Sequence, residues 1–81
     1  MIPYKNLSKE SGVLAYEILP EGIRVQFIGK ETYYYSYTAP GVEHVGKMKE
    51  LAEKGRGLAT YISQHIQTNF DHKEETNTDE E

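Results

Sequence analysis

Residues 23–38 decide the fold of this chain and read IRVQFIGKETYYYSYT. Apolar and polar side chains alternate over residues 23–27, which is the period-two pattern of a half-buried strand. Gly29 and Lys30 then form a two-residue hairpin turn in this interpretation. Residues 32–38 are rich in tyrosine and threonine, which are good strand formers. The stretch therefore predicts a β-hairpin that carries aromatic side chains on both faces.

A third strand is expected before this hairpin, over residues 13–19, which read VLAYEIL. With two-residue loops at 21–22 and 29–30, Val25 faces both Ile18 and Tyr34. The predicted core face consists of Leu14, Tyr16, Ile18, Ile23, Val25, Phe27 and Tyr34. The predicted outer face consists of Ala15, Glu17, Leu19, Arg24, Gln26, Ile28, Tyr33, Tyr35 and Tyr37. A one-residue slip or a bulge at either turn would exchange these faces.

Two helices are expected after the strands. The first begins near Pro40 and ends at Gly55, a residue suited to a left-handed cap. The second runs from about Gly57 or Leu58 to Asn69. Their apolar stripes contain Val42, Val45, Met48, Leu51 and Ala52 in the first helix, and Leu58, Tyr61, Ile62, His65 and Ile66 in the second. The predicted fold is α+β, a three-stranded antiparallel β-meander followed by two C-terminal helices packed on one face.

Composition divides the chain into three parts. Residues 1–11 are predicted to be an irregular lead-in, residues 12–70 a single small α+β domain, and residues 71–81 a disordered acidic tail. The tail holds six acidic residues and one lysine, so its net charge is more negative than the −4 of the whole chain. The remainder is close to neutral and does not have the strongly basic character of many nucleic-acid binders.

The composition also excludes several classes of protein. The chain has no cysteine, which rules out disulfides, thiolate metal sites and cysteine nucleophiles. No run of 18 apolar residues occurs, and the N-terminus lacks the apolar region of a signal peptide. These features predict a cytoplasmic protein that neither spans nor binds a membrane.

Several short motifs occur in an order typical of one family. They are Ser11-Gly12-Val13-Leu14-Ala15-Tyr16, Ile23-x-Val25-x-Phe27, Tyr33-x-Tyr35-x-Tyr37, Met48-Lys49-x-Leu51-Ala52 and Gly55-x-Gly57-Leu58. In this order they resemble the KTSC domain, a short module named after the C-terminus of some lysyl-tRNA synthetases. The central Tyr-x-Tyr pair of the family matches Tyr33 and Tyr35. The resemblance implies a small binding module and suggests RNA as a ligand, while residues 58–61 depart from the asparagine-rich or aromatic stretch of the family.

The tyrosine-rich strand provides the main candidate site. Tyr33, Tyr35 and Tyr37, with Arg24 and Gln26 on the neighbouring strand, could form a platform on which unpaired bases of RNA or single-stranded nucleic acid stack. The same face could instead bind a protein partner or a second copy of the chain. A third interpretation is that tyrosine serves only as a strand former that packs under other elements.

A second candidate lies at the turn between the helices, where Lys54 and Arg56 could contact phosphate with help from free amides of the next helix. The alternative is that the glycines of this turn are helix caps and the lysines a solvated face.

No metal site, cofactor or catalytic residue is predicted. His44, His65 and His72 are widely separated and lack the paired spacing of metal ligands. We place His65 at the edge of the core, because it lies on an apolar stripe. Both aspartates fall in the predicted tail, and no serine has the surroundings of a nucleophile. The chain is therefore interpreted as a non-enzymatic binding module.

Overall fold

The computed structural model describes residues 1–5, 12–29 and 31–74. Lys30 of the predicted turn, residues 6–11 of the lead-in and residues 75–81 of the tail lie outside the described residues. The strands are β1 (Ile2–Pro3), β2 (Val13–Leu19), β3 (Gly22–Phe27), β4 (Thr32–Ser36) and β5 (His72–Glu74). The helices are α1 (Val42–Lys54), α2 (Leu58–Tyr61) and the π-helical turn η1 (Ile62–Ile66).

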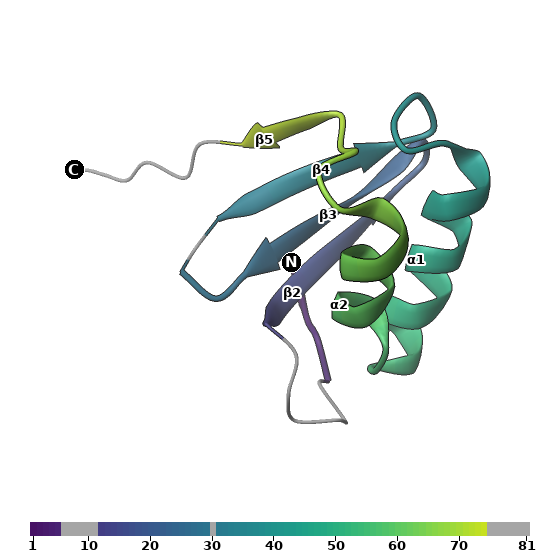
Figure 1. The fold of residues 1–81 in the computed structure, drawn as a ribbon. Helices are drawn as coiled ribbons and strands as arrows, with labels where there is room; N and C mark the ends of the chain where they lie inside the picture. The colour runs from purple at the N-terminus through teal and green to yellow at the C-terminus, as the bar shows by residue number, and fades with distance from the viewer. Residues whose placement is uncertain (6–11, 30, 75–81) are drawn as a thin grey trace.

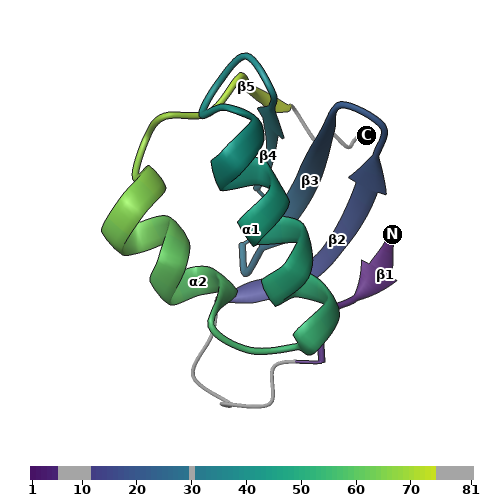
Figure 2. The ribbon, with the colours of Figure 1, turned by 90° about the vertical axis from the view of Figure 1, so that its right-hand side faces the viewer.

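The five strands form one antiparallel sheet in the order β1-β2-β3-β4-β5. Both helices lie on the same side of this sheet (Figures 1 and 2). The expected α+β class, with an antiparallel sheet and two helices on one face, is confirmed. The expected number of three strands is wrong, because a short strand is added at each edge.

The two edge strands fall in segments that we expected to be irregular or disordered. Beside β1, the Tyr4 N–H donates to the Leu14 carbonyl at 2.9 Å, and before β5 the Asp71 N–H donates to the Tyr34 carbonyl at 2.8 Å. Pairing with an existing strand orders two or three residues that have no strand signal of their own. The lead-in and the tail are therefore partly structured.

The core lies between the sheet and the helices. Its buried apolar residues are Tyr4, Val13, Tyr16, Ile23, Val25, Tyr35, Val45, Met48, Ala52, Leu58, Ile62 and Ile66. The α1 stripe is confirmed for three of its five positions, while Leu51 is half-buried and Val42, the first residue of α1, is 57% exposed. The helix ends at Gly55, whose φ of 84° is the predicted left-handed cap.

The hairpin between β2 and β3 differs from the prediction by two residues. Leu19 pairs with Gly22, and Ile18 pairs with Ile23 rather than with Val25. Because side chains alternate with a period of two, this shift leaves each side chain on its predicted face. The predicted positions of the apolar residues in β3 therefore hold despite the wrong turn.

The hairpin between β3 and β4 differs by one residue, and this difference has larger consequences. The Phe27 N–H donates to the Glu31 carbonyl at 2.8 Å, so three residues rather than two separate this pair. Val25 consequently pairs with Tyr33 instead of Tyr34. An odd shift moves every side chain of a strand to the opposite face. The predicted facing of the β4 tyrosines is therefore inverted.

A glycine matches this register. Gly22 pairs with Ser36, and the ring of Tyr34 lies over Gly22 on the outer face. A Cβ atom at position 22 would lie 2.7 Å from the Tyr34 Cε1 atom and would overlap the Tyr35 carbonyl oxygen. Only glycine leaves room for both groups.

A β-bulge in β2 changes the position of one further residue that we expected in the core. The pairing with β3 shifts between Val13 and Ala15, so Leu14 is the extra residue. Leu14, which we expected in the core, is 45% exposed, whereas its neighbour Val13 is 2% exposed. The alternation that placed Leu14 in the core does not continue through the bulge.

The second helix is shorter than predicted and changes its geometry. Four α-helical residues lead into η1, in which hydrogen bonds span five residues. Ile62 and Ile66 remain buried, but the wider turn leaves His65 exposed rather than at the core edge. Gln67 then ends the helix with a φ of 54°.

The inverted register of β4 can be tested by substitution. Tyr35→Ala should lower the free energy of unfolding by about 3–5 kcal/mol, because it removes a buried ring from the core. Tyr34→Ala should lower it by only about 1 kcal/mol, because this half-buried ring lies on the outer face. Urea denaturation of both variants measures the difference. Equal losses, or a larger loss for Tyr34→Ala, would contradict the register.

Candidate functional site

The expected tyrosine platform does not form on the outer face of the sheet. Tyr33, Tyr35 and Tyr37 all lie on the helix side, whereas Arg24 and Gln26 lie on the outer side as predicted. Tyr35 is 1% exposed and belongs to the core. Burial, followed by the neighbouring phenol of Tyr33, raises the Tyr35 pKa. These tyrosines and the two polar residues therefore cannot contact one ligand together.

Tyr37 interacts with a lysine of α1. The Lys49 ammonium lies 5.2 Å from the centroid of the Tyr37 ring and donates to the Tyr37 hydroxyl at 3.3 Å. The same ammonium donates to the Leu19 carbonyl at 2.9 Å. Lys49 thus links the helix to the β2–β3 turn, and its three contacts give it a structural role.

Arg24 is held by two carboxylates on the outer face. Its Nη1 atom lies 2.7 Å from Glu17 Oε1, and its Nε atom lies 2.7 Å from Glu74 Oε2. The hydrogen bonds to Glu74 and then to Glu17 raise the Arg24 pKa. A phosphate would have to displace both carboxylates to reach the guanidinium. This arrangement ties β5 to β3 across the intervening strand.

Ser36, Asp71 and His72 meet at the β4–β5 edge. The Ser36 hydroxyl donates to Asp71 Oδ2 at 2.7 Å, and His72 Nδ1 lies 2.9 Å from Asp71 Oδ1. The carboxylate lies between the hydroxyl and the imidazole, so the imidazole is not placed to accept the serine proton. The geometry serves to attach β5 rather than to activate a nucleophile.

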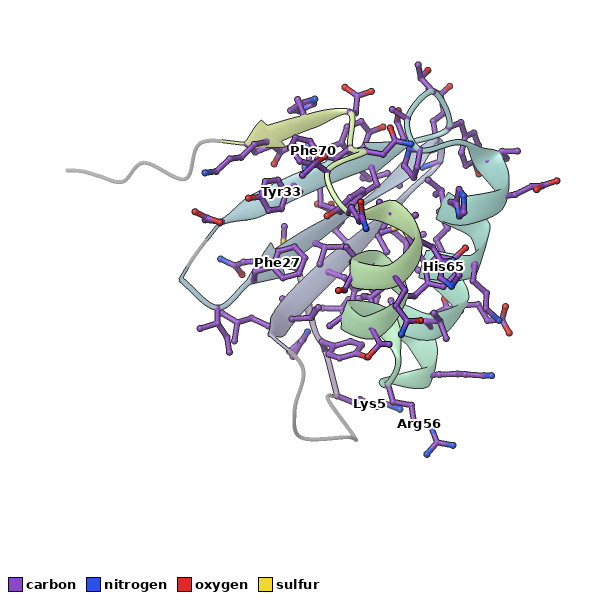
Figure 3. All side chains as sticks on the ribbon, in the orientation of Figure 1. Lys5, Phe27, Tyr33, Arg56, His65 and Phe70 are labelled. Carbon is purple, nitrogen blue, oxygen red and sulfur yellow. The ribbon has the colours of Figure 1, made fainter. Side chains whose placement is uncertain are left out.

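Three aromatic side chains form a cluster on the helix side of the sheet, which we call the aromatic cluster: Phe27, Tyr33 and Phe70. The Phe27 and Tyr33 rings are 5.6 Å apart and the Tyr33 and Phe70 rings 4.7 Å apart. All three are half-buried and pack against the edge of the core. Figure 3 shows them to the side of the helices, where the sheet extends beyond the helical layer. The cluster is therefore a partly accessible aromatic surface.

The polar rim of the aromatic cluster is charge-balanced. The Lys73 ammonium lies 3.3 Å from Glu31 Oε2 and 5.9 Å from the centroid of the Tyr33 ring. The Tyr33 hydroxyl donates to Glu31 at 3.1 Å. Lys73, and then Tyr33, lower the Glu31 pKa, while burial and then this hydrogen bond raise the Tyr33 pKa. One cation and one anion thus offset each other beside the rings.

The turn between the helices carries a cluster of cations that we call the basic corner: Lys5, Lys54 and Arg56. A Cβ atom at Gly55 would lie 2.6 Å from the Lys5 Cβ atom, so the N-terminal lysine packs against this turn. Figure 3 shows Lys5 and Arg56 at the same end of the molecule. Within the described ranges, only Lys54 of the three has an ion pair, at 3.9 Å from Glu50.

One of the amides expected to be free at this turn is already bonded. The Leu58 N–H, at the start of α2, donates to the Tyr4 hydroxyl at 3.2 Å. This contact joins residues far apart in the sequence and leaves that amide unavailable to a phosphate. The basic corner consequently cannot use the Leu58 amide. Sequence reasoning missed Lys5, because no local pattern places the N-terminal segment beside the helix turn.

The histidines occupy two separate places. His44 Nδ1 lies 2.7 Å from the Tyr61 hydroxyl, and the Tyr61 and His65 rings are 4.7 Å apart. His72 lies at the opposite edge, on β5. In the part of the chain that the structure describes, no three histidine, aspartate or glutamate side chains gather as metal ligands would.

The helices of the described residues are too short to cross a membrane.

Comparisons with protein-family models, with curated proteins and with solved structures found no match to this chain. The KTSC resemblance therefore stays a prediction based on the motifs. The Tyr-x-Tyr pair that carries it lies on the helix side of the sheet, with Tyr35 in the core. Packing alone accounts for tyrosine at position 35.

Acidification should loosen β5. His72, then Ser36, lower the Asp71 pKa, and Lys73 lowers that of Glu31. A carboxyl with a lowered pKa stabilises the folded state above its usual pKa, and the contribution is lost as pH falls through the folded value. We expect the hydrogen-exchange protection of the Asp71 amide to fall below about pH 4.

The Val45 amide of α1, which donates to the Gly41 carbonyl at 2.9 Å, is the internal control. Its protection should change little over the same range, because none of these carboxyls contacts it. Equal protection of the Asp71 amide at pH 6 and pH 3, after correction for intrinsic exchange, would contradict the expected attachment.

Proposed function

We propose that this chain is a protein-interaction module that contacts its partner through the aromatic cluster. The observation that carries the proposal is that Phe27 and Phe70 each contact Tyr33, and that all three rings stay half-exposed beyond the helices. Aromatic side chains dominate the energetics of protein interfaces, because they bury a large area with few rotatable bonds. Partly exposed rings in contact are therefore suited to receive an apolar side chain of another protein.

The surroundings of the cluster favour a protein over nucleic acid. Base stacking needs an accessible ring face, but Tyr33 has Phe70 at 4.7 Å and the Lys73 ammonium at 5.9 Å. Phosphate binding needs cations that are not already neutralised, and Lys73 is paired with Glu31. A partner that supplies an aliphatic or aromatic residue with few charges fits this surface better.

A selection from a displayed peptide library tests the proposal. The immobilised domain should enrich peptides with large apolar residues, and binding should change little between low and high salt, because apolar contacts are not screened. Phe27→Gln should reduce binding of the enriched peptides at least tenfold, since it removes one of the three rings. Surface plasmon resonance with synthetic peptides measures the change.

Tyr37→Gln is the matched control for this experiment. Tyr37 is an aromatic residue on the same side of the sheet, but it contacts Lys49 rather than the cluster. It should leave peptide binding unchanged. Thermal unfolding of both variants checks that they fold. Failure to enrich any peptide, or enrichment that survives Phe27→Gln, would overturn the proposal.

Binding of RNA or single-stranded nucleic acid is the second candidate, and the basic corner favours it. Lys5 packs against Gly55, the residue before Arg56, and neither Lys5 nor Arg56 has an ion pair inside the described ranges. Such cations can contact phosphates and release counterions. The candidate keeps the phosphate contacts predicted at the helix turn, Lys54 and Arg56, and adds Lys5, but it does not use the tyrosine face.

This second candidate predicts a steep dependence on salt. A pool of short single strands should shift the amide resonances of Gly55, Arg56 and Gly57 at low salt, and the shifts should disappear at moderate salt. Lys5→Gln with Arg56→Gln should abolish them, whereas Arg24→Gln should not, because Arg24 is held by two carboxylates. An absence of shifts at low salt would exclude nucleic-acid binding at the basic corner.

The remaining assignments belong to the same proposal. We propose a non-enzymatic KTSC-like module located in the cytoplasm. The ordered motifs support the family, and a chain without cysteine is suited to a reducing compartment. A partner identified with the peptides would test the cellular location directly.

A further inference from the structure

Residues 67–74, which we call the C-terminal strap, lie outside the buried core. Ile66 is the last buried apolar residue of the described chain, and the side chains of the strap are exposed or half-exposed. Phe70 packs against the edge of the core, and the other residues of the strap are not part of it. The strap can detach without opening the rest of the domain, as an edge element of low local stability.

The strap begins at a strained residue. Gln67 has φ 54° and ψ −116°, and the Asn69 N–H donates to the Ile66 carbonyl at 2.9 Å. These values describe a type II′ turn with Gln67 at its first central position, where glycine is the usual residue. A residue with a Cβ atom is disfavoured in this conformation. The strap can pair with β4 of its own chain only through this turn, whose conformation is unfavourable for glutamine at position 67.

The site that receives the strap is the edge of β4. The Tyr34 carbonyl accepts the Asp71 N–H, and the Ser36 hydroxyl donates to the Asp71 carboxylate. The Phe70 ring covers Tyr33 and contacts Tyr35 at 6.2 Å between centroids.

Two ion pairs complete this site. They join Glu74 of the strap to Arg24, and Lys73 of the strap to Glu31. Except for Arg24 on β3, the groups that receive the strap lie on β4 and in the turn before it. They form one continuous receptor for an extended segment.

We propose that two copies of this chain exchange their C-terminal straps, each strap pairing with β4 of the other copy. Opening the turn at Gln67 lets this residue return to an extended conformation with negative φ and removes the strain. The turn bond from Asn69 to Ile66 is lost, but the contacts of the strap with β3, β4 and Glu31 are remade between copies, because the receptor and the segment are unchanged. The strap of a second copy fits this receptor, since it supplies the same phenylalanine and the same charged side chains.

This inference goes beyond the proposed function and does not depend on it. An exchanged strap leaves the same three rings in the aromatic cluster, with Phe70 supplied by the second copy. A dimer could therefore bind a further protein through two such clusters. Peptide selection and strap exchange can each succeed or fail separately.

Cross-linking between singly substituted chains tests the exchange. Thr32 of β4 and Glu74 of β5 are directly paired, which places their Cα atoms in the range that a disulfide spans. The natural chain has no cysteine, so only introduced thiols react. An oxidised mixture of Thr32→Cys and Glu74→Cys chains should give a covalent dimer joined through these two positions, beyond what either variant forms alone.

Substitution of the hinge provides a second, independent test. Gln67→Gly should stabilise the closed monomer and raise the dissociation constant of the dimer about tenfold, because glycine adopts this conformation without strain. Gln67→Ala is the matched control, since it removes the same side chain but keeps a Cβ atom, and it should dimerise like the natural chain. Sedimentation equilibrium measures both constants.

Two results would overturn the proposal. The first is a natural chain that sediments as a monomer up to its solubility limit, with no cross-link in the mixture while a chain carrying both cysteines cross-links within itself. The second is a dimer that Gln67→Gly and Gln67→Ala affect equally, because this dimer would not depend on strain at the hinge.

Discussion

The pairing of Ile23 with Tyr35 across β3 and β4 is the constraint on which the rest of the structure depends. It places both side chains under the helices, where they are almost completely buried. The same register puts the Tyr34 ring over Gly22 on the outer face. Any larger residue at position 22 would occupy the space of this ring. A shift of β4 by one residue would move the Tyr34 ring to the helix side and expose Tyr35 on the outer face.

This register changes the meaning of the tyrosine-rich strand. The three consecutive tyrosines lie in three different environments. Tyr35 lies in the core, Tyr33 belongs to the aromatic cluster, and Tyr34 covers Gly22 on the outer face. The charged residues around them form pairs that fasten neighbouring strands, as Arg24 does with Glu17 and Glu74. Packing explains most of the tyrosines in a strand that the sequence led us to expect as a binding surface. The surface that remains for binding is smaller and lies on the helix side of the sheet.

The C-terminal part of the domain combines features that differ from the rest. A π-helical turn is followed by Gln67 in a conformation that favours glycine, and then by a strand held at the sheet edge by polar groups. Irregular helix turns and strained backbone are common where proteins change conformation or bind partners. The edge of β4 that the strap covers is the kind of surface that, once uncovered, pairs with another strand.

The sequence by itself determined the α+β class, the extent of α1 with its cap at Gly55, and the faces of β3, because alternation and helical periodicity are local properties. Tertiary structure decided the β4 register, the exposure of Leu14 and His65, the edge strands and the approach of Lys5 to Gly55. A turn one residue longer, a bulge or a π-turn changes a face without changing the local pattern. Contacts between distant segments have no local signal, since they depend on which surfaces the folded core brings together.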